Sequence, residues 1–554
     1  MASHLLVLLS FVFFTALVAF ATWLFTRKED TSTQSGFFLA GRSLTFPFIA
    51  GSLLLTNLST EQMVGLNGDA FAFGLSEMVW EVVAVVALVA MALFFLPRYL
   101  KSGITTLPEL LEIRYDSTTR VLCNLVFMIF YATVLLPMIL YTGAKGLSDM
   151  MDLKALTGIQ NDTAILWLMV WLVGLIGAAY ALFGGLRTVV VSDTFNGIGL
   201  LIGGLLITFF GLAYIGGDSG WMSGFSKMYE AMPDKFNSIG GPRDQTPFWS
   251  IFAGVIIIHL FYWCTNQQII QRTLAAKSLK EGQKGVLLCG ALKLLGPLYL
   301  VLPGIMALYI MKHMPGEGLD VPDRVNAYGR LVGRVLPKPL VGFFAAVMVG
   351  AILSSFNSAL NSTCTLFTLD IYKKYLRKNA DNREIVRVGQ IFGIVIAVIA
   401  MLVAPLLAGQ KSIFGFLQKM NGFYSIPIFA IILLGLLNKK VPAKAANFAL
   451  VFGLAVIAFV YFVLPVLPKP IGVDISKFPG VNYYFLGVVF AVLILLMLLW
   501  SRLAPRKEGA WVQKDVGAVS LTPWRFAVPA GVILLILVFV NYALFADFSV
   551  WFKR

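Results

Sequence analysis

The chain has 554 residues, of which 58% are hydrophobic and 13% are charged, whereas a soluble globular chain carries about 25% charged residues. This apolar excess excludes a soluble enzyme or binding domain, because a single soluble core stops growing near about 250–300 residues. The net charge of +15 is dispersed over short basic clusters between apolar runs, which is typical of membrane-protein loops and argues against a nucleic-acid partner.

Apolar runs long enough to cross a bilayer recur along the whole chain. Helices are expected, because runs of this length do not suit barrel strands of alternating polarity. Since a spanning helix needs about 20 apolar residues, the chain is predicted to be an all-α polytopic membrane protein with about fourteen transmembrane helices. In chain order they cover residues 4–26, 46–66, 77–97, 121–145, 163–184, 190–216, 248–268, 284–311, 340–365, 387–408, 413–437, 443–465, 483–501 and 526–549.

The loops indicate the orientation of the chain in a cell membrane. An even number of spans places both termini on one side, and Lys and Arg are more frequent in the inner loops when the termini lie outside. The basic loop at 312–338 opposes this orientation. No soluble domain fits between the spans, because the longest gaps, near 217–247 and 312–339, measure about 30 residues.

The second segment is interrupted by polar side chains. Residues 56–62 read Thr-Asn-Leu-Ser-Thr-Glu-Gln inside an otherwise apolar stretch. A broken helix exposes backbone carbonyls, which can replace the water around a cation. A helix end that caps itself is the alternative, but Gly51 to Leu58 lies too deep in the segment for an ordinary terminus. We therefore expect an ion site at this break.

Ionisable side chains inside spans indicate function, because insertion of one costs about 2.5–3.5 kcal/mol. Glu81 and Lys293 each stand alone in an apolar run, so either they pair with each other or they bind a ligand. His259 begins a stretch, 259–268, that mixes aromatic and amide side chains. Aromatic rings alone are more typical of a core or an interfacial belt, but the amides beside them favour a pocket for a small polar ligand such as a sugar.

The ninth segment carries small residues on one face. Ala351, Ser354, Ser355 and Ser358 recur at the spacing of a single helical face. Close helix packing is one interpretation. Opposite a broken helix, the hydroxyls are also suitable oxygen ligands for a hard cation, and both interpretations stay open.

Residues 262–278, from Tyr262 to Ser278, closely resemble a signature of the sodium/solute symporter family, in particular of its sodium/glucose and sodium/galactose branch. Further matches at 38–42, 184–187, 302–304 and 360–363 extend the resemblance over nearly the whole chain. It implies a leucine-transporter-type core of two inverted five-helix repeats with broken helices, flanked by extra helices. The implied domains are 1–45 with an extra helix, 46–216 and 217–437 with the repeats, and 438–554 with three extra helices.

The resemblance also implies an ion site. Sodium would be held by backbone carbonyls and two hydroxyls, and an acid would lie near its exit route. The implied carbonyls are those of Leu55, Leu58 and Ala351, the hydroxyls are those of Ser354 and Ser355, and the acid is Asp193.

For the sugar, the resemblance implies hydrogen-bonding groups, a stacking ring and an outer gate. The hydrogen-bonding groups would be Gln62, Glu81, Lys293 and Gln418, the inner stacking ring and gate would be Tyr262, and the outer gate would be Leu66, Trp80 and Phe414. His259 and Ala84 also occupy sugar-contacting positions, but galactose symporters have Asn and Ser there. Galactose itself is therefore not implied.

The implied function is sodium-driven symport of a hexose-like sugar by alternating access, with the sodium ion and the lipid bilayer as partners and a monomer or weak oligomer as the assembly. Proton coupling and another small polar solute, such as inositol, sialic acid, proline or pantothenate, stay open. A transporter-like sensor would need a soluble signalling domain. An enzyme is not expected, because the sequence shows no nucleophile–base pair, zinc pattern or phosphate-binding loop.

Overall fold

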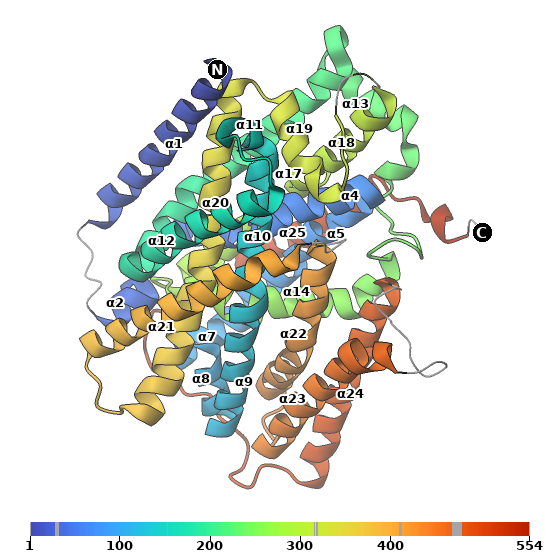
Figure 1. Ribbon diagram of the computed structural model, residues 1–554. Coiled ribbons are helices and arrows are strands. Elements are labelled where there is room, and N and C mark those ends of the chain that lie inside the picture. Colours follow the sequence, from blue (N-terminus) through green and yellow to red (C-terminus); the bar gives the residue numbers. More distant parts are fainter. Residues whose placement is uncertain are drawn as a thin grey trace.

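The computed structural model describes residues 2–27, 33–151, 153–314, 316, 319–408, 413–467 and 479–552. Within these ranges the chain is built from helices, and extended backbone pairs only at two isolated bridges. Among the described residues, ten helices are long and apolar enough to cross a membrane, or up to eleven if one bent pair is a single span. The protein is therefore an all-helical, multi-pass membrane protein (Figure 1).

The helices of the first half of the chain alternate between long spans and short pieces. They are α1 (Ala2–Thr26), α2 (Gln34–Leu39), α3 (Phe46–Asn57), α4 (Asn67–Phe73), α5 (Val79–Val82), α6 (Ala84–Ala90), α7 (Leu96–Ser102), α8 (Leu107–Arg114), α9 (Ser117–Phe130), α10 (Leu136–Met151), α11 (Leu153–Thr157), α12 (Asp162–Gly216) and α13 (Gly220–Ala231). The 55 residues of α12 hold two spans, Asp162–Ala181 and Leu186–Ala231, the second of which runs on into α13.

The helices of the second half of the chain also alternate between long spans and short pieces. Its helices are α14 (Gly254–Thr265), α15 (Gln267–Leu274), α16 (Leu279–Lys293), α17 (Gly296–Leu300), α18 (Leu302–His313), α19 (Ala327–Val335), α20 (Lys338–Phe367), α21 (Asn382–Val403), α22 (Ile413–Leu437), α23 (Ala443–Ala458), α24 (Pro479–Leu503) and α25 (Ala527–Ala543). The bent pair is Leu279–Lys293 with Gly296–His313, and its two parts meet at 53°.

The predicted count of about fourteen spans exceeds the number of full-length apolar helices. The three expected segments without such a helix coincide with shorter apolar helices, α3, α14 and α25. Two of these are short because the chain leaves the helix in mid-segment. After α3 a second piece follows at α4, and after α14 a second piece follows at α15. The resemblance implies a broken first helix in the first repeat, and the division into repeats at 46–216 and 217–437 stays a prediction.

Burial separates a central group of helices from a peripheral one. In the most apolar window of Leu75–Ser102 and of Phe414–Leu437, 78% of the residues are buried, against 11% in Leu5–Thr26 and 28% in Gly480–Leu503. The peripheral helices expose large apolar side chains such as Phe13 and Leu495, as a lipid-facing surface requires. Polar side chains of the central helices are therefore shielded from lipid.

The broken helix α3 lies in the middle of the molecule. It packs against α12 and α20 on one side and against α16 on another, while α14 packs against α6, α22 and α24. In Figure 1, α1, α12 and α20 occupy one flank, and α22, α23 and α24 occupy the opposite one. The breaks in α3 and α14 therefore lie between two groups of long helices.

An extended segment, residues 504–524, crosses the face that holds several basic loops. We call it the crossing segment. Its backbone N–H groups donate from Arg506 to the Lys440 carbonyl (3.0 Å) and from Val516 to the Lys101 carbonyl (3.1 Å). The Ser520 carbonyl accepts from the Leu279 N–H (2.9 Å). The crossing segment thus connects the ends of α7 and α22 to the start of α16.

Candidate functional site

The interruption expected within residues 54–62 is present. α3 ends at Asn57, Leu58 has a non-helical ψ of 62°, and the chain resumes at Glu61 in a wide helical turn, η2 (Glu61–Leu66), that leads into α4. The Leu58 N–H still donates to the Leu54 carbonyl (2.8 Å). The carbonyls at the end of α3 lack their usual helical partners, which makes them available to a ligand.

The serine face of α20 meets this break. Ser355 Oγ donates to the Thr56 carbonyl at 3.3 Å, and Ser358 Oγ lies 3.4 Å from Thr56 Oγ1. The Ser354 hydroxyl interacts with the buried carboxylate of Asp193 on α12. All three hydroxyls are buried, so the small-residue face is used for close packing and also places oxygens opposite the end of α3.

Of the sodium ligands implied by the resemblance, Leu55, Leu58 and Ala351 are fully buried around this junction. The carbonyl that Ser355 contacts belongs to Thr56, between the two leucines. Sequence reasoning did not single out this carbonyl. Its position in the chain was inside the polar run, but only the packing of α3 on α20 shows which carbonyl faces the serine.

Asp193 of α12 is buried close to the same junction. Its Oδ2 accepts a hydrogen bond from Ser52 Oγ at 2.7 Å, and Ser354 of α20 also interacts with its carboxylate. Ser52 lies one turn before Thr56 on α3. The structure therefore brings the acid predicted for the ion's exit route to the helix that carries the break.

Arg272 of α15 is a buried cation to which sequence reasoning gave no role. Its guanidinium donates to Ser358 Oγ and to the Gln268 carbonyl (2.7 Å), and the charge of Asp193 acts on it. A fully buried arginine needs such partners, because an unpaired buried charge costs several kcal/mol. Arg272 thus connects the serine face of α20 to Gln268 of α15.

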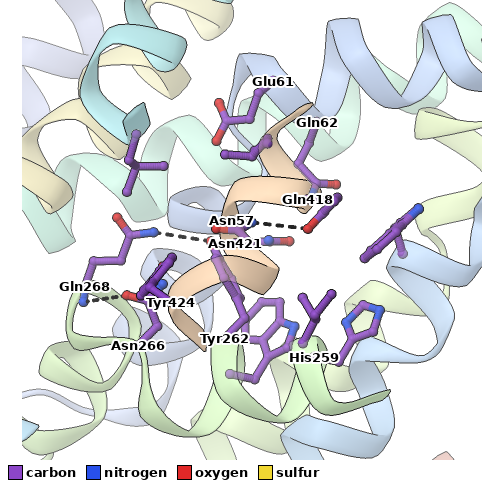
Figure 2. A pocket seen from close by; sticks show the side chains of 15 residues that line it. Asn57, Glu61, Gln62, His259, Tyr262, Asn266, Gln268, Gln418, Asn421 and Tyr424 are labelled. Atoms are coloured by element: carbon purple, nitrogen blue, oxygen red, sulfur yellow. Dashed lines mark hydrogen bonds between the residues drawn. The ribbon is translucent and has the colours of Figure 1, made fainter. Parts of the chain in front are cut away.

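A polar cavity lies beside the break after α3 (Figure 2). It is lined by Asn57, Glu61, Gln62, Trp80, Leu135, Ile258, His259, Tyr262, Trp263, Asn266, Gln268, Leu417, Gln418, Asn421 and Tyr424. The cavity has a volume of about 40 Å³. Since one water needs roughly 10–15 Å³ by that measure, a sugar-sized ligand would require side chains to move apart.

Polar atoms without partners converge on the cavity. They are Asn57 Oδ1, Glu61 Oε2, Gln62 Oε1, His259 Nε2 and Gln268 Oε1. Each buried polar atom without a hydrogen bond costs about 1–3 kcal/mol. Gln418 accepts from Asn421 (3.1 Å), and Gln268 donates to the Tyr262 hydroxyl (3.4 Å), as Figure 2 shows. Several unsatisfied groups around one space are typical of a site that receives a polar ligand.

Aromatic rings form one wall. The Trp80 ring lies 5.4 Å from the ring of His259 and 5.4 Å from that of Phe414, measured between centroids. Phe414 does not itself line the cavity and packs behind Trp80, and Leu66 is fully buried away from the lining. Of the predicted gate residues, Trp80 and Tyr262 therefore border the cavity, whereas Leu66 and Phe414 do not.

Glu81 and Lys293 also lie outside the lining. Lys293 Nζ is 2.6 Å from Glu81 Oε2, and neither side chain is exposed. Lys293 Nζ lies 5.5 Å from the ring centroid of Trp263, and Trp263 lines the cavity. Of the alternatives that the sequence left open, the structure shows the pairing. The predicted sugar-binding residues that it brings together are Gln62, His259, Tyr262 and Gln418.

The second break, in α14, was not predicted. α14 ends at Thr265, and Asn266 takes a non-helical ψ of 123° while its Oδ1 accepts from the Gln268 N–H (3.2 Å). Asn is a preferred residue before the first turn of a helix, so Asn266 ahead of two glutamines was the available signal. Glu61 was also missed, although it lay within the polar run 56–62, and it lines the cavity.

Comparisons with known proteins agree with this geometry. Residues 37–453 match the family model described as the sodium:solute symporter family. The "Uncharacterized symporter YidK" of Escherichia coli (strain K12) is 44% identical over 98% of this chain and 91% of its own. The "Sodium/glucose cotransporter" of Vibrio parahaemolyticus is 34% identical over 81% of this chain and 84% of its own.

Among solved structures, a sodium-coupled sialic acid symporter in a substrate-bound outward-open state superposes with a TM-score of 0.72. The match covers 90% of this chain and 98% of the other at 20% identity, and it shows a shared fold. The family model covers most of the chain, and its members are transporters and not enzymes. The chain is a multi-pass cell-membrane protein that belongs to the sodium:solute symporter family.

Proposed function

We propose that the protein uses sodium entry to drive uptake of a hexose-like sugar by alternating access. One observation carries this proposal: the open carbonyl end of α3 faces the buried hydroxyls of α20, and the same break borders the polar cavity. Asn57 at the end of α3 and Gln62 in η2 both line that cavity. An ion held at the break therefore positions groups that bind the sugar.

The lining favours a neutral sugar. It combines amides, one carboxyl group and aromatic rings, and it contains no Lys or Arg among the described residues. A carboxylate-bearing substrate such as sialic acid would meet Glu61 without a compensating cation, which makes its burial costly. The similarity to glucose cotransporters supports the same choice, and other neutral polyols such as inositol are the second candidates.

One sodium ion supplies enough energy for strong accumulation. A tenfold sodium gradient contributes about 1.4 kcal/mol, and a membrane potential of 100 mV contributes about 2.3 kcal/mol per charge. The sum, about 3.7 kcal/mol, supports a several-hundredfold sugar gradient. Binding must also be reciprocal, so sodium raises sugar affinity by the same factor as sugar raises sodium affinity.

Uptake into proteoliposomes tests the proposal. We expect a labelled neutral hexose to accumulate under an inward sodium gradient, and not under a proton gradient of equal driving force. Sialic acid and proline supplied at the same concentration should not accumulate. Accumulation of the hexose under the proton gradient alone would refute sodium coupling, and accumulation of sialic acid or proline in its place would refute the substrate class.

His259 offers a test of specificity. Its Nε2 has no partner among the described residues and its ring borders the cavity beside Trp80. We expect His259→Asn to change the ratio of glucose to galactose uptake by about tenfold, because one hydrogen bond of about 1.4 kcal/mol corresponds to that factor. Competition between the two labelled sugars measures it. His313→Asn, away from the cavity, is the matched control, and an unchanged ratio would remove His259 from the site.

A further inference from the structure

A second hollow lies near the start of α1 and shares no lining residue with the polar cavity. Its volume is about 570 Å³. The lining comes from the end of α10, from α11 and α19, and from the first turns of α12 and α20, with one residue of α1. In Figure 1 the N-terminus, α11 and α19 are seen at the same end of the molecule. In the predicted orientation this end is the outer one.

Basic side chains dominate the wall of this hollow, which we call the basic hollow. Among the described residues, five basic side chains and two acids line it. The basic residues are Lys145, Lys154, Arg330, Arg334 and Lys338, and the acids are Asp149 and Asp162. A concave surface with charges mainly of one sign concentrates ions of the opposite sign, so the basic hollow attracts anions.

Both acids of the basic hollow already have partners. Asp149 Oδ2 accepts a hydrogen bond from Asn326 Nδ2 at 2.6 Å, and the charge of Lys145 acts on the same carboxylate. Asp162 Oδ1 lies 2.8 Å from Lys154 Nζ. Two negative charges therefore face five positive ones, and most of the positive charge of the lining stays unbalanced.

The remaining cations are weakly held. Arg330 Nη1 lies 3.7 Å from Asp320 Oδ2, which does not line the hollow, and both side chains of this pair are exposed to water. Such exposed pairs contribute little, about 0–1 kcal/mol. Lys145 and Lys338 form neither an ion pair nor a hydrogen bond through their ammonium groups with any described residue. Their charges are therefore available to a ligand.

The basic hollow also accounts for the basic loop that opposes the predicted orientation. Residues 312–338 carry five basic side chains on the side predicted to be outer, although inner loops usually hold such residues. Three of the five, Arg330, Arg334 and Lys338, line the hollow, where they meet two lysines from residues 145–154. Two segments far apart in the sequence thus bring their basic side chains to one concave surface.

We propose that the basic hollow binds a phosphate group, carried by a phospholipid headgroup or by a soluble phosphate ester. Arginine binds two phosphate oxygens at once through its planar guanidinium, and lysine binds phosphate as a point charge. Arg330 and Arg334 are four residues apart on α19, so their side chains are neighbours on one helix face. Lys145 and Lys338 approach from α10 and α20, which places cations on several sides of one ligand.

The surroundings of the basic hollow favour the lipid as the source of this phosphate. Val7 of α1 and Val341 of α20 form an apolar part of the lining. α1 exposes large apolar side chains next to Val7, such as Leu5 and Leu9, and such a surface suits acyl chains. Basic pockets between membrane helices are known to bind lipid headgroups. A headgroup in the hollow therefore leaves its acyl chains beside α1.

A bound phosphate would connect helices that surround the transport core. α19 packs against α4, the second piece of the broken helix, and α10 packs against both α19 and α20. The ligand contacts all three of α10, α19 and α20, so it holds their outer ends together. The inference goes beyond the proposed sodium-driven sugar transport, because this phosphate is bound and not transported.

Lipid and phosphate binding to the purified full chain in a neutral detergent tests the site. We expect native mass spectrometry to show phosphatidylglycerol bound at least about tenfold more tightly than phosphatidylcholine. Lys145→Gln combined with Lys338→Gln should remove this preference, because each lysine supplies a charge-assisted bond worth about tenfold in affinity. Binding of radiolabelled inorganic phosphate, measured by equilibrium dialysis with chloride at constant ionic strength, should fall in the same variant.

The two measurements distinguish the sources of the phosphate. Preference for phosphatidylglycerol identifies a lipid, whereas phosphate binding that the variant loses, without any lipid preference, identifies a soluble ester. Lys312→Gln, in the same loop but outside the lining, is the matched control and should bind as the wild type. Arg330→Gln provides a second variant if the double variant does not fold.

Two results would overturn the basic hollow as a phosphate site. One is a wild type that binds neither inorganic phosphate nor phosphatidylglycerol above the chloride and phosphatidylcholine backgrounds. The other is a folded double variant that binds both as tightly as the wild type. Neither measurement involves sodium or sugar, so this site and the proposed transport function fail separately.

Discussion

Ser355→Ala is expected to abolish sodium-driven uptake while leaving the protein folded. The hydroxyl of Ser355 is the side-chain group that contacts the open end of α3, 3.3 Å from the Thr56 carbonyl. A hydrogen-bonding oxygen that contacts a charge contributes about 1.5–3 kcal/mol, so its loss should weaken sodium binding by about 10–100-fold. The small change in volume at a tightly packed helix face should affect folding little.

The initial rate of sugar uptake, measured over a range of sodium concentrations, checks this prediction. The dependence on sodium should shift far to the right or vanish, whereas sugar exchange without a gradient should persist at a reduced level. Ser219→Ala removes an exposed hydroxyl from a surface turn and should behave as the wild type. Wild-type sodium dependence in Ser355→Ala would remove the hydroxyl from the proposed ion site.

Removing one partner of the Glu81–Lys293 pair should destabilise the protein more than removing both. Both side chains are fully buried at a distance of 2.6 Å, and loss of one leaves the other as an uncompensated buried charge. Such a loss costs about 3–5 kcal/mol, whereas replacing a buried pair by neutral residues is often tolerated. We expect Lys293→Met to lower the unfolding temperature strongly and Glu81→Gln combined with Lys293→Met to recover most of the loss.

Thermal unfolding of the two single variants and the double variant in detergent gives the coupling between the residues. Sugar binding measured on the same proteins separates stability from recognition. If the double variant is stable yet binds no sugar, the pair contributes to recognition through Trp263 or after a rearrangement. Additive losses of stability in the two single variants would contradict the pairing.

Hydropathy located the full-length apolar helices of the described residues, because each needs a long apolar run, but three of the about fourteen expected segments hold only shorter helices. The break after Asn57 was also predictable, since polar side chains such as Thr56 and Gln62 interrupt an apolar helix there. The break at Asn266 was hidden, because the amides at 266–268 lie between the aromatic run 261–263 and Ile269–Ile270, so the apolar pattern has no clear end there. Helix-capping chemistry, more than hydropathy, marks that position.

Contacts between distant segments could not be read from the sequence. The pairing of Glu81 with Lys293 joins α5 to α16. The sequence of neither helix shows how far apart the two side chains lie in the fold. The carbonyl that meets Ser355 depends on the register of α3 against α20, so the sequence predicted the oxygens as a set but not the Thr56 contact.

The crossing segment limits which parts of the molecule can move independently. Its backbone forms hydrogen bonds with the carbonyls of Lys101 and Lys440 and with the N–H of Leu279. These bonds connect the adjoining ends of α7, α22 and α16 to one another through a single stretch of chain. Long helices α12 and α20 make none of these bonds. In the proposed transport cycle we expect α12 and α20 to move relative to these connected ends, so an ion bound between α3 and α20 would link the two parts.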